Sequence, residues 1–217
     1  GNFGVDDVTI SDICIPPTPT DTLTPTNTFT PSATSTPTNT LIFSLTPTLT
    51  PIPSEVVISE VAWFGTIASP NDEWIELYNP RSVPVDISGW RLVNSSGSVD
   101  IVINNPTNLP ANGFYLLERA RDNTVSDVPA DQIYTGSLPD SGDILTLSRS
   151  TGTVVDTANS DGGTWPAGFG SPNFYSMERV VNGTVAAKDN SAGWITNNNS
   201  ATWTGRDANN NLIHGTP

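Results

Sequence analysis

The chain has 217 residues and a formal net charge of −14, with 22 acidic residues against eight basic ones. Nucleic acids require a basic footprint, so we expect no nucleic-acid partner. Cys14 is the only cysteine and His214 the only histidine, which excludes an internal disulfide and a His–His metal site. No apolar run approaches the roughly 20 residues that span a bilayer, so we expect no membrane insertion. A low charge density with abundant Thr, Ser, Asn, Gly and Pro is typical of an extracellular or cell-surface protein.

Residues 1–15 are predicted to form an isolated β-strand, in which apolar residues alternate with polar ones. A single strand is not stable in water, because its backbone groups and apolar face need a partner. Two interpretations stay open: a remnant of an upstream jelly-roll domain, or a donor strand that adds to the sheet of another subunit. The side chains that would carry such assembly are Phe3, Val5, Val8, Ile10, Ile13 and Ile15.

Residues 16–53 form a Thr/Pro-rich linker. Proline recurs every six residues from Pro19 to Pro37, and Thr or Ser fills every even position from Thr18 to Thr40. Proline fixes φ and removes a backbone donor, so the segment is predicted to be extended. The threonines are candidates for O-glycosylation, and an unmodified spacer stays an alternative. The candidates are Thr18, Thr20, Thr22, Thr24, Thr26, Thr28, Thr30, Thr34, Thr36, Thr38 and Thr40, and the expected apolar contacts of the linker are Leu23, Phe29, Leu41 and Phe43.

Residues 54–217 have the pattern of an all-β domain. Hydrophobicity repeats with a period of two, and turn residues follow every 8–15 positions, which predicts an antiparallel sandwich. We expect Ile75 and Leu77 to point inward, Glu76 to point outward, and residues 181–217 to be mostly loop, anchored by Trp194 and Trp203. The predicted strands are 55–63, 72–79, 89–94, 98–103, 113–119, 131–135, 143–149, 153–158 and 174–180.

Several sequence blocks in this domain resemble the lamin tail domain of bacterial proteins. The first, DEWIELYNPRSVPVDISGWRLVN (72–94), has the pattern E-x-I-E-L-x-N followed by D-x-S-G-W-x-L. The resemblance extends over about residues 55–217 and implies an immunoglobulin-like sandwich without catalytic residues. In bacteria, such domains are add-on modules of secreted or surface proteins. The later blocks are LPANGFYLL (109–117), LPDSGDILTLSRSTGTVVDTA (138–158), SMERV (176–180) and TGRDANNNLIHGTP (204–217).

The carboxylates of the domain do not suggest catalysis. Glu73 and Glu76 lie three residues apart on a predicted strand, so they point to opposite faces and cannot flank one scissile bond. Asp140 and Asp143 bracket a tight turn, where capping of backbone amides is the favoured role. We therefore expect a protein that is not an enzyme and needs no cofactor.

Two further groups are candidate ligand contacts. Asp207, Asn209 and Asn211 have the odd spacing of a calcium loop, but no glycine occupies the sixth position and no bidentate glutamate follows. This calcium candidate is therefore weak. Trp165 and Phe169 lie in a Gly/Pro-rich loop and are predicted to be exposed, where aromatic rings could hold a glycan.

These observations lead to two hypotheses of different classes. The first is a non-enzymatic, self-assembling subunit of a surface filament, a homopolymer in which residues 1–15 add to a neighbouring sheet and the linker carries glycans. The second is a glycan- or ligand-binding accessory module of a larger secreted bacterial enzyme.

Overall fold

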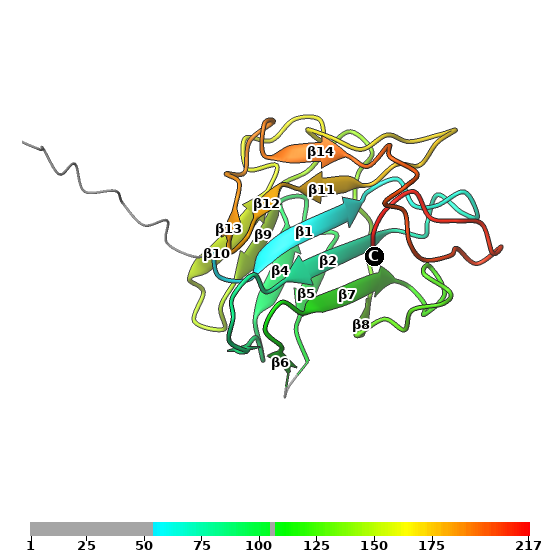
Figure 1. Cartoon of the computed structure of the whole chain (residues 1–217). Helices are drawn as coiled ribbons and strands as arrows, with labels where there is room; N and C mark the ends of the chain where they lie inside the picture. Colours follow the sequence, from blue (N-terminus) through cyan, green and yellow to red (C-terminus); the bar gives the residue numbers. More distant parts are fainter. Residues whose placement is uncertain (1–53, 105–106) are drawn as a thin grey trace, which may run out of the picture. The chain divides into compact units, whose positions relative to one another are not determined.

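The computed structural model describes residues 54–104 and 107–217. The predictions for the isolated strand and for the Thr/Pro-rich linker fall on residues 1–53 and lie outside the described residues. The described chain consists of strands and loops, and its strands form two main sheets (Figure 1).

The larger sheet has six strands in the order β14-β11-β1-β2-β7-β8 and is antiparallel except where β8 runs parallel to β7. Its strands are β14 (Trp194–Thr196), β11 (Met177–Arg179), β1 (Val57–Ala62), β2 (Trp74–Tyr78), β7 (Phe114–Arg119) and β8 (Gln132–Tyr134). The smaller sheet has the order β10-β9-β4-β5. Its strands are β10 (Val154–Ala158), β9 (Leu145–Ser148), β4 (Arg91–Asn94) and β5 (Asp100–Val102).

All nine predicted strands are confirmed, since each predicted range contains an observed strand. Besides β14, two short pairs were not predicted. These are β3 (Val85–Asp86) with β6 (Asn108–Leu109), and β12 (Val181–Asn182) with β13 (Val185–Ala186). The segment after residue 180 is nevertheless mostly loop, as predicted, and the side chain of Trp194 is buried. The fold is an immunoglobulin-like β-sandwich.

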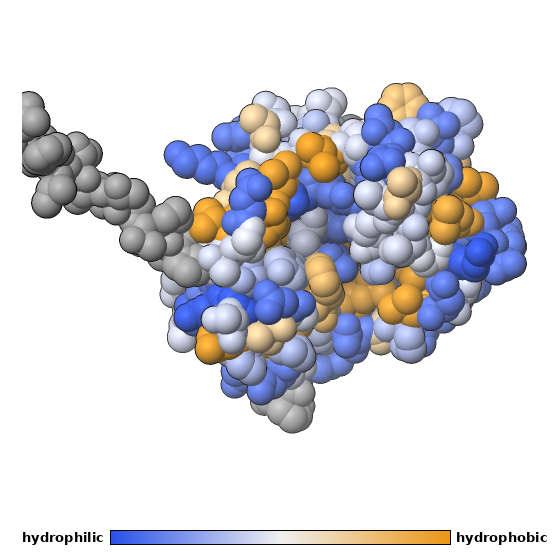
Figure 2. Space-filling model, in the orientation of Figure 1, coloured by the Kyte–Doolittle hydropathy of each residue, from blue (hydrophilic) through white to orange (hydrophobic). Residues whose placement is uncertain are grey.

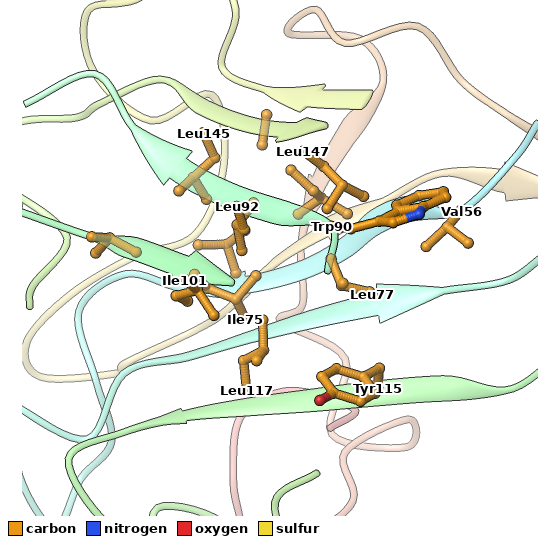
Figure 3. Packing of buried hydrophobic residues seen from close by; sticks show 14 of the residues in the cluster. Val56, Ile75, Leu77, Trp90, Leu92, Ile101, Tyr115, Leu117, Leu145 and Leu147 are labelled. Carbon is orange, nitrogen blue, oxygen red and sulfur yellow. The ribbon is translucent and has the colours of Figure 1, made fainter. Parts of the chain in front are cut away.

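The main core lies between the two sheets (Figure 3). Ile75 and Leu77 of β2 are fully buried and lie opposite Leu145 and Leu147 of β9, which also share one face. Successive side chains of a strand alternate between faces, so the period of two places these residues in one layer. Trp90, just before β4, fills the same layer.

A second, smaller core lies on the other face of the six-stranded sheet. Trp74 of β2 is fully buried there, together with Ala62, Leu116, Val125 and Ile213. Ile213 belongs to the segment near residue 217, which runs over this face (Figure 1). The sheet is therefore covered on part of both faces.

This covering explains why Glu76 is not exposed. Glu76 points away from the main core, as predicted, but only 4% of its surface is exposed. In the register of the sheet, Glu60 of β1 lies beside Glu76 and also beside Glu178 of β11. Three carboxylates therefore form a row on a face that the sequence pattern assigned to solvent.

Candidate functional site

Edge strands of a sandwich expose backbone groups that can pair with another strand unless side chains cover them. On the side of β5 and β8, the side chain of Gln132 closes the edge. Its Nε2 donates to the carbonyl oxygen of Val102 at 2.9 Å, and its Oε1 accepts from the amide of Asn104 at 2.9 Å. Ser98 Oγ donates to the carbonyl oxygen of Ser137 at 2.6 Å on the same side. This edge offers little backbone to a partner.

Glycine is required at the same place. Gly136 has φ of 109°, in the left-handed region, and a Cβ there would lie 1.9 Å from the carbonyl oxygen of Ser98. The close approach of the two chain segments therefore depends on the missing side chain.

On the opposite side, Arg179 of β11 joins the two sheets. Its Nη2 lies 3.0 Å from Asp156 of β10, its Nη1 donates to the carbonyl oxygen of Thr157 at 3.0 Å, and its Nε donates to that of Ala187 at 2.8 Å. The guanidinium also lies over the ring of Trp194, 4.6 Å from its centroid. Side chains therefore cover the C-terminal part of β10, from Asp156 onward.

Asp156 is the partner of Arg179 and also contacts β1. Its Oδ2 accepts from the backbone amide of Ile58 at 2.8 Å, so one carboxylate joins the edge strand β10 of the smaller sheet to the interior strand β1 of the larger one. Burial raises the pKa of Asp156 to about 6, and the positive charge of Arg179 opposes part of this effect. In the sequence, the signal for this ion pair is Arg179, a basic residue inside the strand-like SMERV block. The sequence does not indicate that Asp156 is its partner.

The beginning of β10 is the part of this edge that stays open. Val154 is 57% exposed, and the register shifts between Val154 and Asp156, so Val155 is the extra residue of a β-bulge. A groove of about 470 Å³ runs beside it, lined by apolar residues such as Val57 and by charged ones such as Glu55 and Lys188. We call this the β10 groove.

The loop aromatics do not form the predicted exposed pair. The prediction was wrong for Trp165, which is 7% exposed, donates from Nε1 to the carbonyl oxygen of Pro139 at 2.9 Å, and stacks on Trp63 at 6.1 Å. A large aromatic ring fills the space between the ends of the sheets, and its N–H finds a backbone acceptor there. Phe169 is 50% exposed, as predicted. Because Trp165 is buried, the two rings do not form an exposed platform together.

The weak calcium candidate is a capped loop. Asp207 is 1% exposed, and its Oδ1 accepts from the backbone amides of Asn209 and Asn211, both at 2.9 Å. The side-chain amide of Asn211 donates to both carboxylate oxygens of Asp207. Loop amides thus occupy the lone pairs that a calcium ion would need.

We predict that Asp207→Ala lowers the free energy of unfolding by about 1–3 kcal/mol, because it removes the buried carboxylate that accepts hydrogen bonds from the loop amides of Asn209 and Asn211. Millimolar calcium chloride is expected to leave the melting temperature of the unchanged chain where it is. Thermal unfolding of both chains, with and without calcium, tests this. A clear rise in melting temperature that needs Asp207 would instead establish a calcium site.

The remaining predicted carboxylates anchor loops. Glu73 forms an ion pair with Arg119 at 2.7 Å and accepts from the amide of Leu138 at 2.8 Å. Burial raises the pKa of Glu73 to about 7, against the effect of these partners. Asp143 accepts from the backbone amide of Ser95 and from Ser96 Oγ, so it caps another turn than the one that it brackets with the exposed Asp140.

Among residues 54–104 and 107–217, no group of three or more His, Cys, Asp or Glu side chains is placed to hold a metal ion. The same residues include no helix that is long and apolar enough to cross a membrane.

The two packed sheets define an immunoglobulin-like domain. The sequence model of the Lamin Tail Domain family matches residues 50–161. The chain therefore belongs to the lamin tail domain family, a family of non-enzymatic immunoglobulin-like domains, which points to a protein-interaction module. A comparison with curated proteins found no match.

Proposed function

We propose that the protein is an extracellular, non-enzymatic structural subunit that assembles into a homopolymer by β-strand addition. Residues 1–15 of one copy would pair with β10 of a neighbouring copy, with alternate apolar side chains in the β10 groove. Residues 16–53, extended and carrying glycans on the threonines, would span on the order of 100 Å between the paired strand and its own sandwich.

The observation that carries this proposal is the open beginning of β10. The amide of Arg149 donates to the carbonyl oxygen of Thr153, so in an antiparallel ladder the backbone groups of the next residue, Val154, point away from β9. Val154 lies beside the β10 groove, whereas Gln132 caps the edge on the opposite side. An incoming strand would find backbone partners there, beside a groove whose lining combines apolar side chains with charged ones.

Deletion of residues 1–15 is expected to leave a folded monomer. The full chain is expected to form polymers, and electron microscopy with size-exclusion chromatography compares the two. Fibres formed by the deletion variant would contradict the proposal. A monomeric full chain with saturable polysaccharide binding would favour the accessory-module alternative, for which Phe169 is the remaining exposed aromatic candidate.

A matched pair of substitutions locates the acceptor. Val154→Lys places a charge beside the β10 groove and is expected to reduce assembly at least tenfold, because an incoming strand would have to bury that charge. Val102→Lys is the control: Val102 is 56% exposed, like Val154 at 57%, but lies on the capped edge. Equal effects of both variants on assembly would exclude β10 as the acceptor.

A further inference from the structure

The row of three glutamates lies in a hollow on the outer face of the six-stranded sheet. Glu178, Glu60 and Glu76 occupy neighbouring positions on β11, β1 and β2. They line a cavity of about 270 Å³, together with Thr216 from the segment that crosses this face. Figure 2 shows this face hollowed over β1 and β2.

Glu76 and Glu178 each use only one oxygen in hydrogen bonds with described residues, and Glu178 Oε1 also accepts from the side-chain amide of Asn197. Glu60 Oε1 accepts from the amide of Thr216 at 3.0 Å, and Glu178 Oε1 accepts from Thr216 Oγ1 at 2.7 Å. Glu76 Oε1 accepts from Ser59 Oγ at 2.6 Å. Glu60 is 1% exposed and Glu76 4%. Glu60 Oε2 is fully buried, and hydrogen bonding from Ser176 and Trp74 lowers the pKa of Glu60 against the larger effect of burial, so the oxygens that a ligand could reach are those of Glu76 and Glu178.

The chain itself supplies no cation to this row. No ion pair between described residues includes any of the three glutamates. Arg179 lines the hollow, but its guanidinium is held by Asp156 and the carbonyl of Thr157. The segments outside the described residues, 1–53 and 105–106, contain no Lys or Arg. The row can therefore be neutralised only by protons or by a cationic group of another molecule.

An aromatic pair forms the rim of the hollow. Tyr78 and Phe114 stack with ring centroids 4.6 Å apart and an angle of 26° between the rings. Both line the cavity, and Phe114 is 56% exposed. Aromatic faces attract an ammonium or a guanidinium group, and carboxylates form charge-assisted hydrogen bonds with the same groups.

We propose that this hollow binds a basic side chain, lysine or arginine, of a partner polypeptide. The cationic group donates to the open oxygens of Glu76 and Glu178, while its aliphatic stem lies against Phe114. The hollow is larger than a metal ion needs, and the three carboxylates are not among any group placed to hold a metal in the described part of the chain. The site is separate from the β10 groove and does not depend on assembly.

Protons compete with the cation for these carboxylates. Burial, and then the charge of Glu178, raise the pKa of Glu60 to about 7, and burial and the charge of Glu60 raise the pKa of Glu76. The titratable and charged groups around the hollow are these three glutamates, Tyr78 and Arg179. A bound cation favours the ionised carboxylates, so binding releases protons and becomes tighter as pH rises from about 5 to 8.

Equilibrium dialysis of the full chain tests the proposal, because it measures binding by polymers and monomers alike. The probes are radiolabelled acetylated tripeptides with lysine, arginine or glutamine between two glycines. The lysine and arginine peptides are expected to bind saturably and the glutamine peptide at least tenfold more weakly. Glu178→Gln and Phe114→Ala are expected to weaken binding of the basic peptides at least fivefold.

The control variant is Asp140→Asn, which removes one acidic charge at an exposed position outside the hollow. It is expected to leave binding unchanged. Equal weakening by Asp140→Asn and Glu178→Gln would show a diffuse charge effect and overturn the proposal. Equal binding of the glutamine peptide, or absence of saturable binding, would overturn it as well. Displacement of the lysine peptide by micromolar calcium would instead assign the hollow to a metal ion.

Discussion

Replacing Arg179 with methionine is expected to lower the free energy of unfolding by about 3–5 kcal/mol at pH 7. The substitution keeps much of the aliphatic stem but leaves Asp156 buried without its cation, and it removes donors from the carbonyl oxygens of Thr157 and Ala187. Urea denaturation measures the loss. Without Arg179 the pKa of Asp156 rises further, so the loss is expected to be smaller at pH 5, where that carboxyl is protonated.

A second Arg–Asp pair provides the control. Arg91 and Asp100 form a two-pronged ion pair at 2.6 and 2.7 Å, with side chains that are 54% and 50% exposed. Exposed ion pairs contribute roughly 0–1 kcal/mol, so Arg91→Met is expected to cost less than about 1 kcal/mol. Similar small losses for both variants would mean that the Arg179 pair does not hold the two sheets together.

The domain is expected to be more stable at pH 5 than at pH 8, and Glu60→Gln is expected to remove part of the difference. The pKa of Glu60 is raised from 4.5 to about 7 by burial and by the charge of Glu178. Between these two values the folded state binds more protons than the unfolded state, so the free energy of unfolding falls as pH rises. The shift corresponds to about 3 kcal/mol, lost mainly between pH 4.5 and 7.

Urea denaturation of the unchanged chain and of Glu60→Gln at pH 5 and pH 8 tests this sign. The neutral amide is expected to raise stability at pH 8 and to change it little at pH 5. Glu73 and Asp156, with pKa values raised to about 7 and about 6, contribute in the same direction and remain in the variant. Greater stability at pH 8 than at pH 5 in both chains would contradict the prediction.

The sequence predicted the strands well because their signal is local. Alternation in segments such as β2 and β9 reports directly which residues share a face. The unpredicted strands β3, β6, β12 and β13 have only two residues, too few for a period of two to be recognised. The fifth, β14, is as long as the predicted strands β5, β8 and β11 but lies in a segment rich in Asn, Gly and Thr.

The site residues depended on long-range packing and were predicted less well. Glu76 occupies a polar position of the strand pattern, but the segment near Ile213 partly covers that face. Nothing local to Trp165 distinguishes a buried ring from an exposed one. The alignment of Glu60, Glu76 and Glu178 exists only once the register of three strands is known.

The position of β1 in the six-stranded sheet has a consequence for the order of folding. β1 pairs on one side with β2, its neighbour in sequence. On the other side it pairs with β11, which begins only at Met177. During synthesis β1 therefore waits with one side unpaired until β11 emerges, and such distant pairing is slow. The family match ends at residue 161, before β11 and β14. A chain cut there would keep the family's signature and still leave the central strand of its larger sheet as an open edge.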